Sequence, residues 1–196
     1  MKRNGPPQFE FTVIAGSLKG RRIVAPDLGI TRPPLTRLRK SIFDFLMPYI
    51  DGARYLDLFS GTGSYLFEAI SRGAVCAVGV EMESRLADAI NQQAEKYEVS
   101  DRLRCLTADV LKVVPSLGGT EAPFDIVMIA PPQYKQILNN TLKRLAGSSL
   151  LNEQTLVICQ HDTKETPGLH YPGYVLKQSR KYGNTTFTVL TPGPSQ

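Results

Sequence analysis

The sequence predicts an α/β fold with a doubly wound, mostly parallel sheet of seven strands. Three observations lead to this prediction. Strand-like and helix-like segments alternate from Arg54 to His161, which is typical of parallel strands covered by helices on both faces. The last two strand-like segments flank a tight turn and predict an antiparallel hairpin at the carboxyl end. A chain of 196 residues, 42% of them apolar, is long enough to enclose one hydrophobic core.

The first 50 residues are expected to form an amino-terminal extension of one β-hairpin and one helix. Two strand-like runs, 10–16 and 20–25, are bridged by "SLK" and bracketed by glycines. A turn-rich stretch leads into a helix within 35–50, where Leu38, Ile42 and Leu46 recur at helical spacing. Pro48 is expected to end this helix.

The alternating segments are expected to form the main domain, over residues 51–191. Its expected strands are 54–60, 74–81, 102–109, 124–130 and 154–161, and its expected helices are 63–73, 84–99, 110–117 and 136–151. The terminal hairpin spans 174–190 with its turn at 182–184, and residues 192–196 are expected to be a flexible tail.

Basic residues are concentrated at the amino end. Residues 1–40 contain nine Lys/Arg against two acids, a balance of +7, whereas the rest of the chain has a balance of −2. This distribution predicts a surface that faces a polyanion, although a solvated charged face explains it equally well. Lys177, Arg180 and Lys181 near the last turn either extend that surface or protect an edge strand by their charge.

The composition excludes several classes of protein. No apolar run approaches the roughly 20 residues of a membrane span, and the amino end lacks a signal-peptide core, so we expect a cytoplasmic protein. The three cysteines, Cys76, Cys105 and Cys159, are scattered without ligand spacing, so we expect buried thiols rather than a disulfide frame or a metal site.

A glycine turn, "SGTGS", follows the first strand of the domain. Gly61 and Gly63 permit the torsions and close ligand approach that such turns need, and ligands of open α/β sheets bind at this place. A dinucleotide motif would have a third glycine where this chain has Leu66, which disfavours a nicotinamide cofactor. Tyr65 directly after the turn either flanks a cofactor or packs in the helix.

Acidic residues follow three successive strands. Asp57, before the glycine turn, would repel a pyrophosphate but could receive the amino group of S-adenosylmethionine. Glu81 could accept the two ribose hydroxyls, Asp109 could accept an adenine amine, and Ala108 could pack on the ring. Each acid alone is more commonly a helix N-cap or a turn residue. Three of them at successive strand ends favour S-adenosylmethionine as the cofactor.

The fourth strand ends in "APPQY", residues 130–134. Prolines donate no backbone hydrogen bond, so carbonyls in this corner are available to a planar amine. A nearby tyrosine could stack on a base taken out of its stack. An ordinary strand-to-helix turn explains the prolines equally well, but not their position beside the glycine turn. The residues assigned to catalysis are Ala130, Pro131, Pro132, Gln133 and Tyr134.

These segments resemble a known family. "DLFSGTGSYLFEAISRGA", "GVEMESRLADAINQQ" and "APPQY" resemble the motifs of class I amino-methyltransferases, which have a Rossmann-like fold. "VIAGSLKGRRIVAP", "TRPPLTRLRKSIFDFL" and "KYGNTTFTVL" resemble more specifically the bacterial 16S rRNA guanine-N2 methyltransferase family, over roughly residues 11–190. The resemblance implies a cytoplasmic enzyme that uses S-adenosylmethionine to methylate N2 of one guanine in the small ribosomal subunit. We expect it to act as a monomer.

The resemblance also implies roles for individual residues. Those implied to line the cofactor site are Asp57, Phe59, Gly61, Gly63, Glu81, Met82, Ala108 and Asp109. Those implied to face RNA are Arg21, Arg22, Arg32, Arg37, Arg39 and Lys40.

The chain departs from the family at the proline corner. The family motif begins with Asp or Asn where this chain has Ala130, and it has an aromatic residue where this chain has Gln133. The carbonyls of Ala130 and Pro131, or the Gln133 amide, could replace the missing acceptor, because positioning alone supplies much of such catalysis. Two alternatives stay open: a DNA adenine amino-methyltransferase, and a non-catalytic ribosome-assembly factor, which Ala130 favours.

Overall fold

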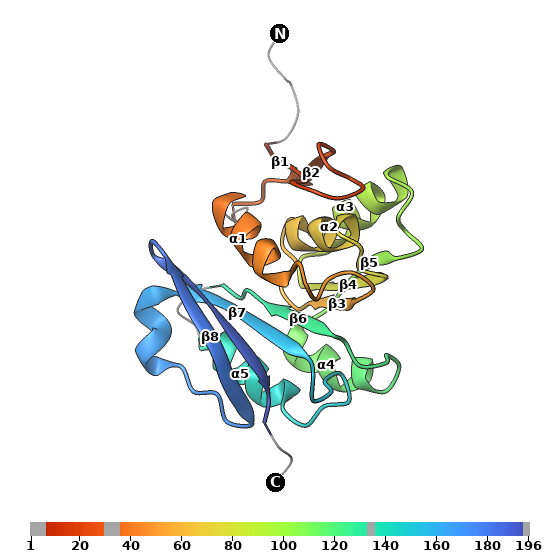
Figure 1. Cartoon of the computed structure of the whole chain (residues 1–196). Coiled ribbons are helices and arrows are strands. Elements are labelled where there is room, and N and C mark those ends of the chain that lie inside the picture. The colour runs from red at the N-terminus through yellow and green to blue at the C-terminus, as the bar shows by residue number, and fades with distance from the viewer. Residues whose placement is uncertain (1–6, 30–35, 133–135, 194–196) are drawn as a thin grey trace.

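A computed structural model describes residues 7–29, 36–132 and 136–193 (Figure 1). Within these ranges seven strands form the predicted mixed sheet, in the order β5-β4-β3-β6-β7-β9-β8. The parallel strands are β3 (Arg54–Asp57), β4 (Cys76–Glu81), β5 (Leu103–Thr107), β6 (Ile126–Ile129) and β7 (Leu156–Asp162). The chain builds outward from β3 to β5 and then returns to β6 on the other side of β3. This reversal creates the crevice in which doubly wound sheets bind ligands.

The predicted carboxyl-terminal hairpin consists of β8 (Tyr174–Tyr182) and β9 (Thr185–Pro192). β9 lies inside the sheet and pairs antiparallel with both β7 and β8, so β8 forms the edge. The burial follows from position: β9 lies between two strands and is mostly buried, whereas the edge strand β8, which carries three cations, is mostly exposed. β9 ends at Pro192, so the first residue of the predicted tail belongs to a strand, and residues 194–196 lie outside the described ranges.

Helices cover both faces of the sheet, which is why β6 is buried along its whole length (Figure 1). One face carries α1 (Thr36–Leu46), α2 (Ser64–Ser71) and α3 (Ser84–Lys96), and the other carries α4 (Val110–Gly118) and α5 (Ile137–Leu145). A 3₁₀ helix, η1 (Thr163–Gly168), follows β7 and was not predicted. No helix of the described ranges is long and apolar enough to cross a bilayer.

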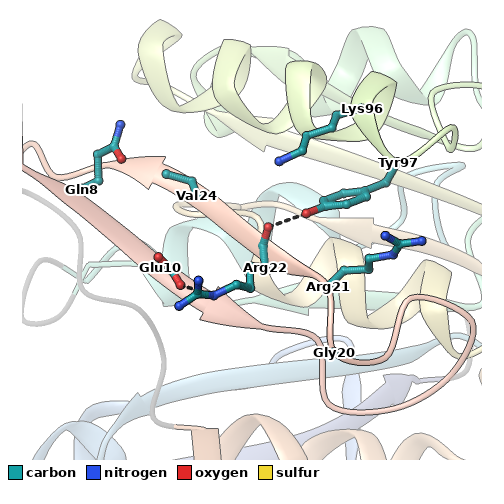
Figure 2. A pocket seen from close by; sticks show the side chains of 8 residues that line it. All are labelled: Gln8, Glu10, Gly20, Arg21, Arg22, Val24, Lys96 and Tyr97. Carbon is teal, nitrogen blue, oxygen red and sulfur yellow. Dashed lines mark hydrogen bonds and ion pairs between the residues drawn. The ribbon is translucent and has the colours of Figure 1, made fainter. Parts of the chain in front are cut away.

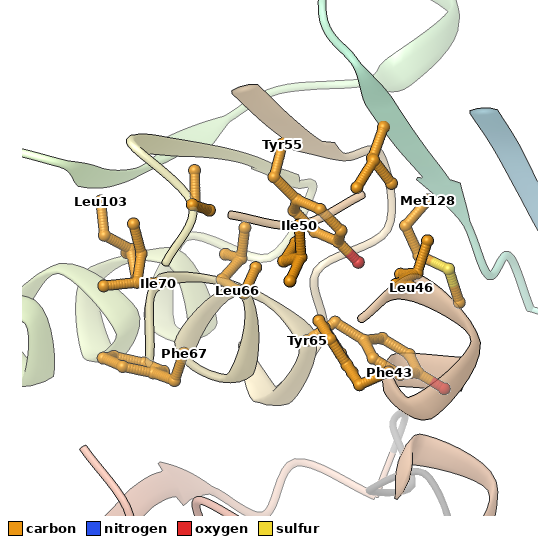
Figure 3. Packing of buried hydrophobic residues seen from close by; sticks show 14 of the residues in the cluster. Phe43, Leu46, Ile50, Tyr55, Tyr65, Leu66, Phe67, Ile70, Leu103 and Met128 are labelled. Carbon is orange, nitrogen blue, oxygen red and sulfur yellow. The ribbon is translucent and has the colours of Figure 1, made fainter. Parts of the chain in front are cut away.

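The face beneath α1, α2 and α3 has a continuous aromatic and aliphatic core (Figure 3). Phe43 of α1 packs between Tyr55 of β3 and Tyr65 of α2, with ring centroids 6.2 and 6.1 Å apart. Leu46 and Met128 extend the same cluster toward β6. The division of the chain after residue 50 stays a prediction; side chains from both sides of it share this one core.

The amino-terminal hairpin is shorter than predicted. Its strands are β1 (Gln8–Thr12) and β2 (Arg22–Pro26), and residues 14–18 leave the ladder to bind α2. Gly16, with φ of 87°, comes so close to α2 that a Cβ there would lie 1.7 Å from the Ser71 carbonyl oxygen. The N–H of Ser17 donates to that oxygen at 2.7 Å. Contacts with the helix therefore replace strand pairing in this loop.

Glu68 of α2 anchors the extension from inside the protein. Its fully buried carboxylate accepts hydrogen bonds from the N–H groups of Ile14 (3.0 Å) and Ala15 (3.2 Å). Arg72 Nε donates to it at 2.8 Å, and Arg39 Nε lies 3.8 Å from its other oxygen. Two cations and two amides compensate the burial of this charge.

Candidate active site

The glycine turn and the proline corner leave the sheet side by side. Asp57 at the end of β3 is in register with Met128 of β6, and the N–H of Leu58 donates to the Met128 carbonyl at 3.0 Å. Ala130 directly follows β6, two residues after Met128. This juxtaposition at the carboxyl edge of the sheet, where the parallel strands end, confirms the predicted neighbourhood of the two turns.

The glycine turn is shaped by two positive φ angles. Gly63 (φ 79°) caps the amino end of α2, and a Cβ at this position would lie 2.7 Å from Ile90 Cγ1 of α3. Gly61 (φ 51°) directs its N–H to Glu81 Oε2 at 2.8 Å. The turn is therefore held between α3 and the end of β4, and both the torsion and the space at Gly63 favour glycine.

Asp57 is a buried carboxylate with one oxygen unsatisfied. Its side chain is fully buried; Oδ1 accepts from the N–H of Phe59 at 3.2 Å, and Oδ2 has no hydrogen-bond partner among the described residues. Burial, and next the negative charge of Glu81, raise the pKa of Asp57 from 3.8 to about 7 despite the Phe59 hydrogen bond. Such a group is suited to a cationic partner with a hydrogen to donate, which would replace the missing solvation.

Glu81 and Asp109 occupy the next two strand ends, as predicted. The half-buried Glu81 accepts from the N–H groups of Gly61 and Glu83, which fixes both oxygens in position. Asp109 is the N-cap of α4 and accepts from the N–H of Leu111 at 2.9 Å. The capping role considered for these acids is thus real for Asp109, whereas Asp57 and Glu81 cap no helix. Three carboxylates follow one another along the carboxyl edge.

Smaller groups lie around these acids. The Ala108 N–H donates to the Glu81 carbonyl at 2.9 Å, so the two strand ends are tied together. Phe59 is half-buried at the glycine turn, and Met82 is 75% exposed just beyond β4. The exposed Met82 side chain, beside the acids, is therefore available to pack on a flat ligand.

At the proline corner, Ala130 and Pro131 are half-buried and Pro132 is exposed. Ala130 packs against the same core as Met128, so its methyl group is on the face of the sheet that carries Asp57. Gln133 and Tyr134 lie outside the described residues, and their assignment to catalysis stays a prediction.

A pair of polar residues that was not assigned to the site joins this corner. The Tyr65 hydroxyl donates to Gln160 Oε1 at 2.5 Å, which links the first turn of α2 to β7. His161, the next residue, has both ring nitrogens bonded inside the protein, to the Asp162 carbonyl and to Thr188 Oγ1. The sequence did contain a signal for Gln160, because it is a polar residue at the end of the fifth parallel strand. Only the structure shows which side of the sheet its side chain faces.

The predicted RNA-facing arginines are separated by the fold. Arg37 and Lys40 are exposed on α1, and Lys40 pairs with Asp44 at 2.5 Å. The prediction for Arg39 is wrong: it is 1% exposed, and Nη2 donates to the Thr12 carbonyl at 2.6 Å. Its position on the inner face of α1 makes it part of the core. Arg32 lies outside the described residues.

Arg21 and Arg22 line an open groove between the hairpin and the end of α3 (Figure 2). The Arg21 guanidinium lies 5.5 Å from the Tyr97 ring centroid, and Arg22 pairs with Glu10 at 2.5 Å. Tyr97 is at the far end of α3 from the glycine turn, and a 13-residue helix is about 20 Å long. This groove is therefore remote from the carboxyl edge.

A second basic area is adjacent to the carboxyl edge. β9 begins at Thr185, in register with Asp162 at the end of β7, so the tip of the β8–β9 hairpin lies at this edge. The hydroxyls of Ser41 and Tyr182 are hydrogen-bonded, which places α1 beside the tip. The exposed basic residues of these two elements are Arg37, Lys40, Lys177, Arg180 and Lys181.

The strand order, the glycine turn and the acidic strand ends define a Rossmann-like methyltransferase fold. The solved structure of yhhF from Escherichia coli matches with a TM-score of 0.82 at 24% identity, covering 95% of this chain and 100% of that one. An RNA methyltransferase from Salinibacter ruber, solved in complex with S-adenosyl-L-homocysteine, matches with a TM-score of 0.65 at 15% identity, covering 84% and 96%.

The sequence comparisons narrow this class to one family. The family described as Conserved hypothetical protein 95 matches residues 11–191. Ribosomal RNA small subunit methyltransferase D of Escherichia coli K12 is 30% identical over 168 residues, which are 83% of this chain and 80% of the relative. The chain belongs to this family, and the resemblance found in the sequence motifs is confirmed.

Proposed function

We propose that this protein is an S-adenosylmethionine-dependent methyltransferase that modifies the exocyclic N2 of a guanine in small-subunit rRNA. Membership in the family of an rRNA methyltransferase supports the reaction and the class of substrate. The observation that carries the proposal is the buried Asp57 carboxylate, with one oxygen lacking a partner among the described residues, beside the proline corner.

The acidic strand ends fit S-adenosylmethionine. Asp57 Oδ2, which has no hydrogen-bond partner among the described residues, would accept a hydrogen bond from the ammonium group of the cofactor's methionine portion. Glu81, whose oxygens are already aligned by two N–H groups, would accept the ribose hydroxyls. Asp109 would accept the adenine amine, and Met82 and Ala108 would pack on the ring. The cofactor, when bound, supplies an electrophilic methyl group.

The proline corner would hold the target amine. Guanine N2 carries two N–H donors, and the carbonyls of Ala130 and Pro131 are acceptors that require no side chain. Holding N2 there would direct its lone pair toward the cofactor, and orientation alone is a large contribution to such a transfer. The surplus proton on nitrogen would leave after the new bond has formed.

Basic residues would hold the RNA backbone around this corner. The basic area of α1 and β8 flanks the carboxyl edge, and phosphate contacts fix the register of a nucleic acid without reading its sequence. In this proposal the protein acts as a monomer in the cytoplasm, on small subunits.

The test is a methyl-transfer assay with the labelled cofactor on unmodified small subunits and, separately, on free rRNA, followed by mass spectrometry of the nucleosides. We expect label only in N2-methylguanosine. Label in another nucleoside would contradict the guanine-N2 assignment, and absence of label would contradict methyl transfer. A deletion strain should lack one N2-methylguanine of its small-subunit rRNA.

One second candidate is favoured by a specific residue. Ala130 removes the side-chain acceptor typical of the family motif, which favours a non-catalytic assembly factor. That function predicts binding to small subunits without transfer of label under any condition. The same assay, combined with a binding measurement, separates the two candidates.

A further inference from the structure

Gln160 lies next to Ala130 at the carboxyl edge. β7 runs parallel to β6 with Ile129 in register with Cys159, so the residues that follow each of these are neighbours. Side chains alternate along a strand, so Gln160 is on the side of Ile158, and Ile158 belongs to the core that also includes Met128. The half-buried Gln160 therefore places an amide beside the proline corner, where Ala130 presents only a methyl group.

Tyr65 fixes which end of the Gln160 amide faces outward. Its hydroxyl donates to Oε1, and the ring is 4% exposed and held against Phe43. Burial, and next the charge of Asp57, raise the pKa of the Tyr65 phenol, so the hydroxyl keeps its proton and remains a donor. With Oε1 occupied, the Nε2 end of the amide is left to donate, and no described residue accepts from it.

An outward donor at this position has a chemical consequence for base choice. A guanine whose N2 amine is held at the proline corner presents its O6, an acceptor, further along the same edge of the base. An adenine-type base presents an amine there, which is a donor. Two donors facing each other leave both unsatisfied, and sites built to pair with a polar group reject analogues that lack it.

We propose that Gln160, oriented by the Tyr65 hydroxyl, is a specificity-determining residue that donates from Nε2 to O6 of the target guanine. The inference rests on the proposed function and deepens it, because it assigns the selection of guanine to one amide. Gln160 contacts the substrate in this proposal, and Tyr65 is a positioning residue that acts through it.

The test compares two bases that both carry the amine to be methylated. The target guanosine is first located by mass spectrometry of nuclease fragments of the labelled rRNA. Small subunits are then reconstituted with rRNA in which this guanosine is either retained or replaced by 2,6-diaminopurine through splinted ligation. 2,6-Diaminopurine keeps the 2-amine but has an amine in place of O6. Single-turnover rates at saturating cofactor are measured for the wild type, Gln160→Glu, Gln160→Ala and Tyr65→Phe, with cofactor affinity measured in parallel.

The matched control is Gln154→Glu, the same change of charge in the exposed turn that precedes β7. We expect the wild type and the control to prefer guanine by at least about tenfold, the effect of one hydrogen bond. Gln160→Glu should slow transfer to guanine and reverse or abolish the preference, because a carboxylate accepts from the 6-amine. Gln160→Ala should abolish the preference, and Tyr65→Phe should weaken it. Cofactor affinity should change less than about threefold in each.

The outcomes are distinguishable. If the wild type transfers methyl to guanine and the Gln160 variants that fold keep the preference of Gln154→Glu, the inference is overturned and the proposed function stands. If rates fall equally for both bases, Gln160 is structural and the inference is overturned. If the wild type transfers no methyl group to small subunits that carry either base, the proposed function fails and the inference fails with it.

Discussion

Asp57→Asn tests the reasoning about the buried carboxylate, because it removes the charge and nearly keeps the shape. The pKa of Asp57 rises from 3.8 to about 7 on folding, mainly through burial. At 1.36 kcal/mol for each pKa unit, the ionised side chain costs the folded protein about 4 kcal/mol relative to the unfolded chain. Asparagine carries no such cost at any pH.

The sign of the pH dependence follows from the raised pKa. Between about pH 4 and 7 the folded state holds the Asp57 proton more tightly than the unfolded chain, so the contribution of Asp57 to stability falls as pH rises, and it levels off above pH 7. The unfolding free energy of Asp57→Asn, minus that of the wild type, should therefore grow by about 2.5 kcal/mol from pH 5 to pH 8. Urea unfolding of the cofactor-free protein at several pH values measures this difference.

Cofactor binding should show the opposite trend. Only ionised Asp57 can pair with an ammonium group, and a pKa of about 7 leaves about one tenth of the protein ionised at pH 6 and about nine tenths at pH 8. The Kd of the wild type for S-adenosylmethionine should therefore fall about tenfold between these pH values. Asp57→Asn should bind at least about tenfold more weakly at pH 8 and lose this dependence.

Asp88→Asn, which removes an exposed carboxylate of α3, is the matched control and should reproduce both wild-type profiles. Parallel stability curves for Asp57→Asn and the wild type from pH 5 to pH 8 would refute the argument that burial perturbs Asp57. A cofactor affinity that does not change with pH would refute its pairing with a cation.

The remaining predictions concern the extension and the cofactor site. Gly16→Ala should destabilise the fold by at least about 2 kcal/mol by urea unfolding, because strain and a clash with α2 combine; Gly20→Ala has a similar φ without the clash and should cost about 1 kcal/mol. Arg39→Met should lower stability by about 3 kcal/mol, and equal RNA affinity per folded molecule should confirm that Arg39 is structural. Arg37→Ala should leave stability within about 0.5 kcal/mol but reduce the salt slope of subunit binding by about 1; an unchanged slope would remove Arg37 from the interface. Glu81→Gln should weaken cofactor binding about tenfold without changing RNA affinity, and unchanged cofactor affinity would contradict the ribose role.

Much of the site was predictable because it depends on local rules. Parallel strands end at one edge, so acids that follow successive strands must gather there, and Asp57, Glu81 and Asp109 do so. Glycines at the first turn were equally clear, because the left-handed torsion at Gly63 disfavours other residues. The register between Asp57 and Met128 then follows from the pairing of β3 with β6.

The interpretation of single side chains was less predictable. Arg37 and Arg39 are two residues apart on one helix, yet one is exposed and the other is inside the core. Their charges are identical, and only the packing of α1 on Glu68 decides which one is buried. The same limit applies to Asp109. Asp109 is the N-cap of α4, and the sequence alone cannot tell whether such a residue also binds a cofactor.

The sequence alone therefore determined the alternation of strands and helices, the glycine turn and the line of carboxylates, because these depend on periodicity and on contacts close in the chain. Tertiary structure decided the rest: that Asp57 is buried with one oxygen that finds no partner among the described residues, that Arg39 is internal, and that Tyr65 reaches Gln160, 95 residues later. Burial and long-range hydrogen bonds arise only when distant segments pack together, and no local pattern encodes them.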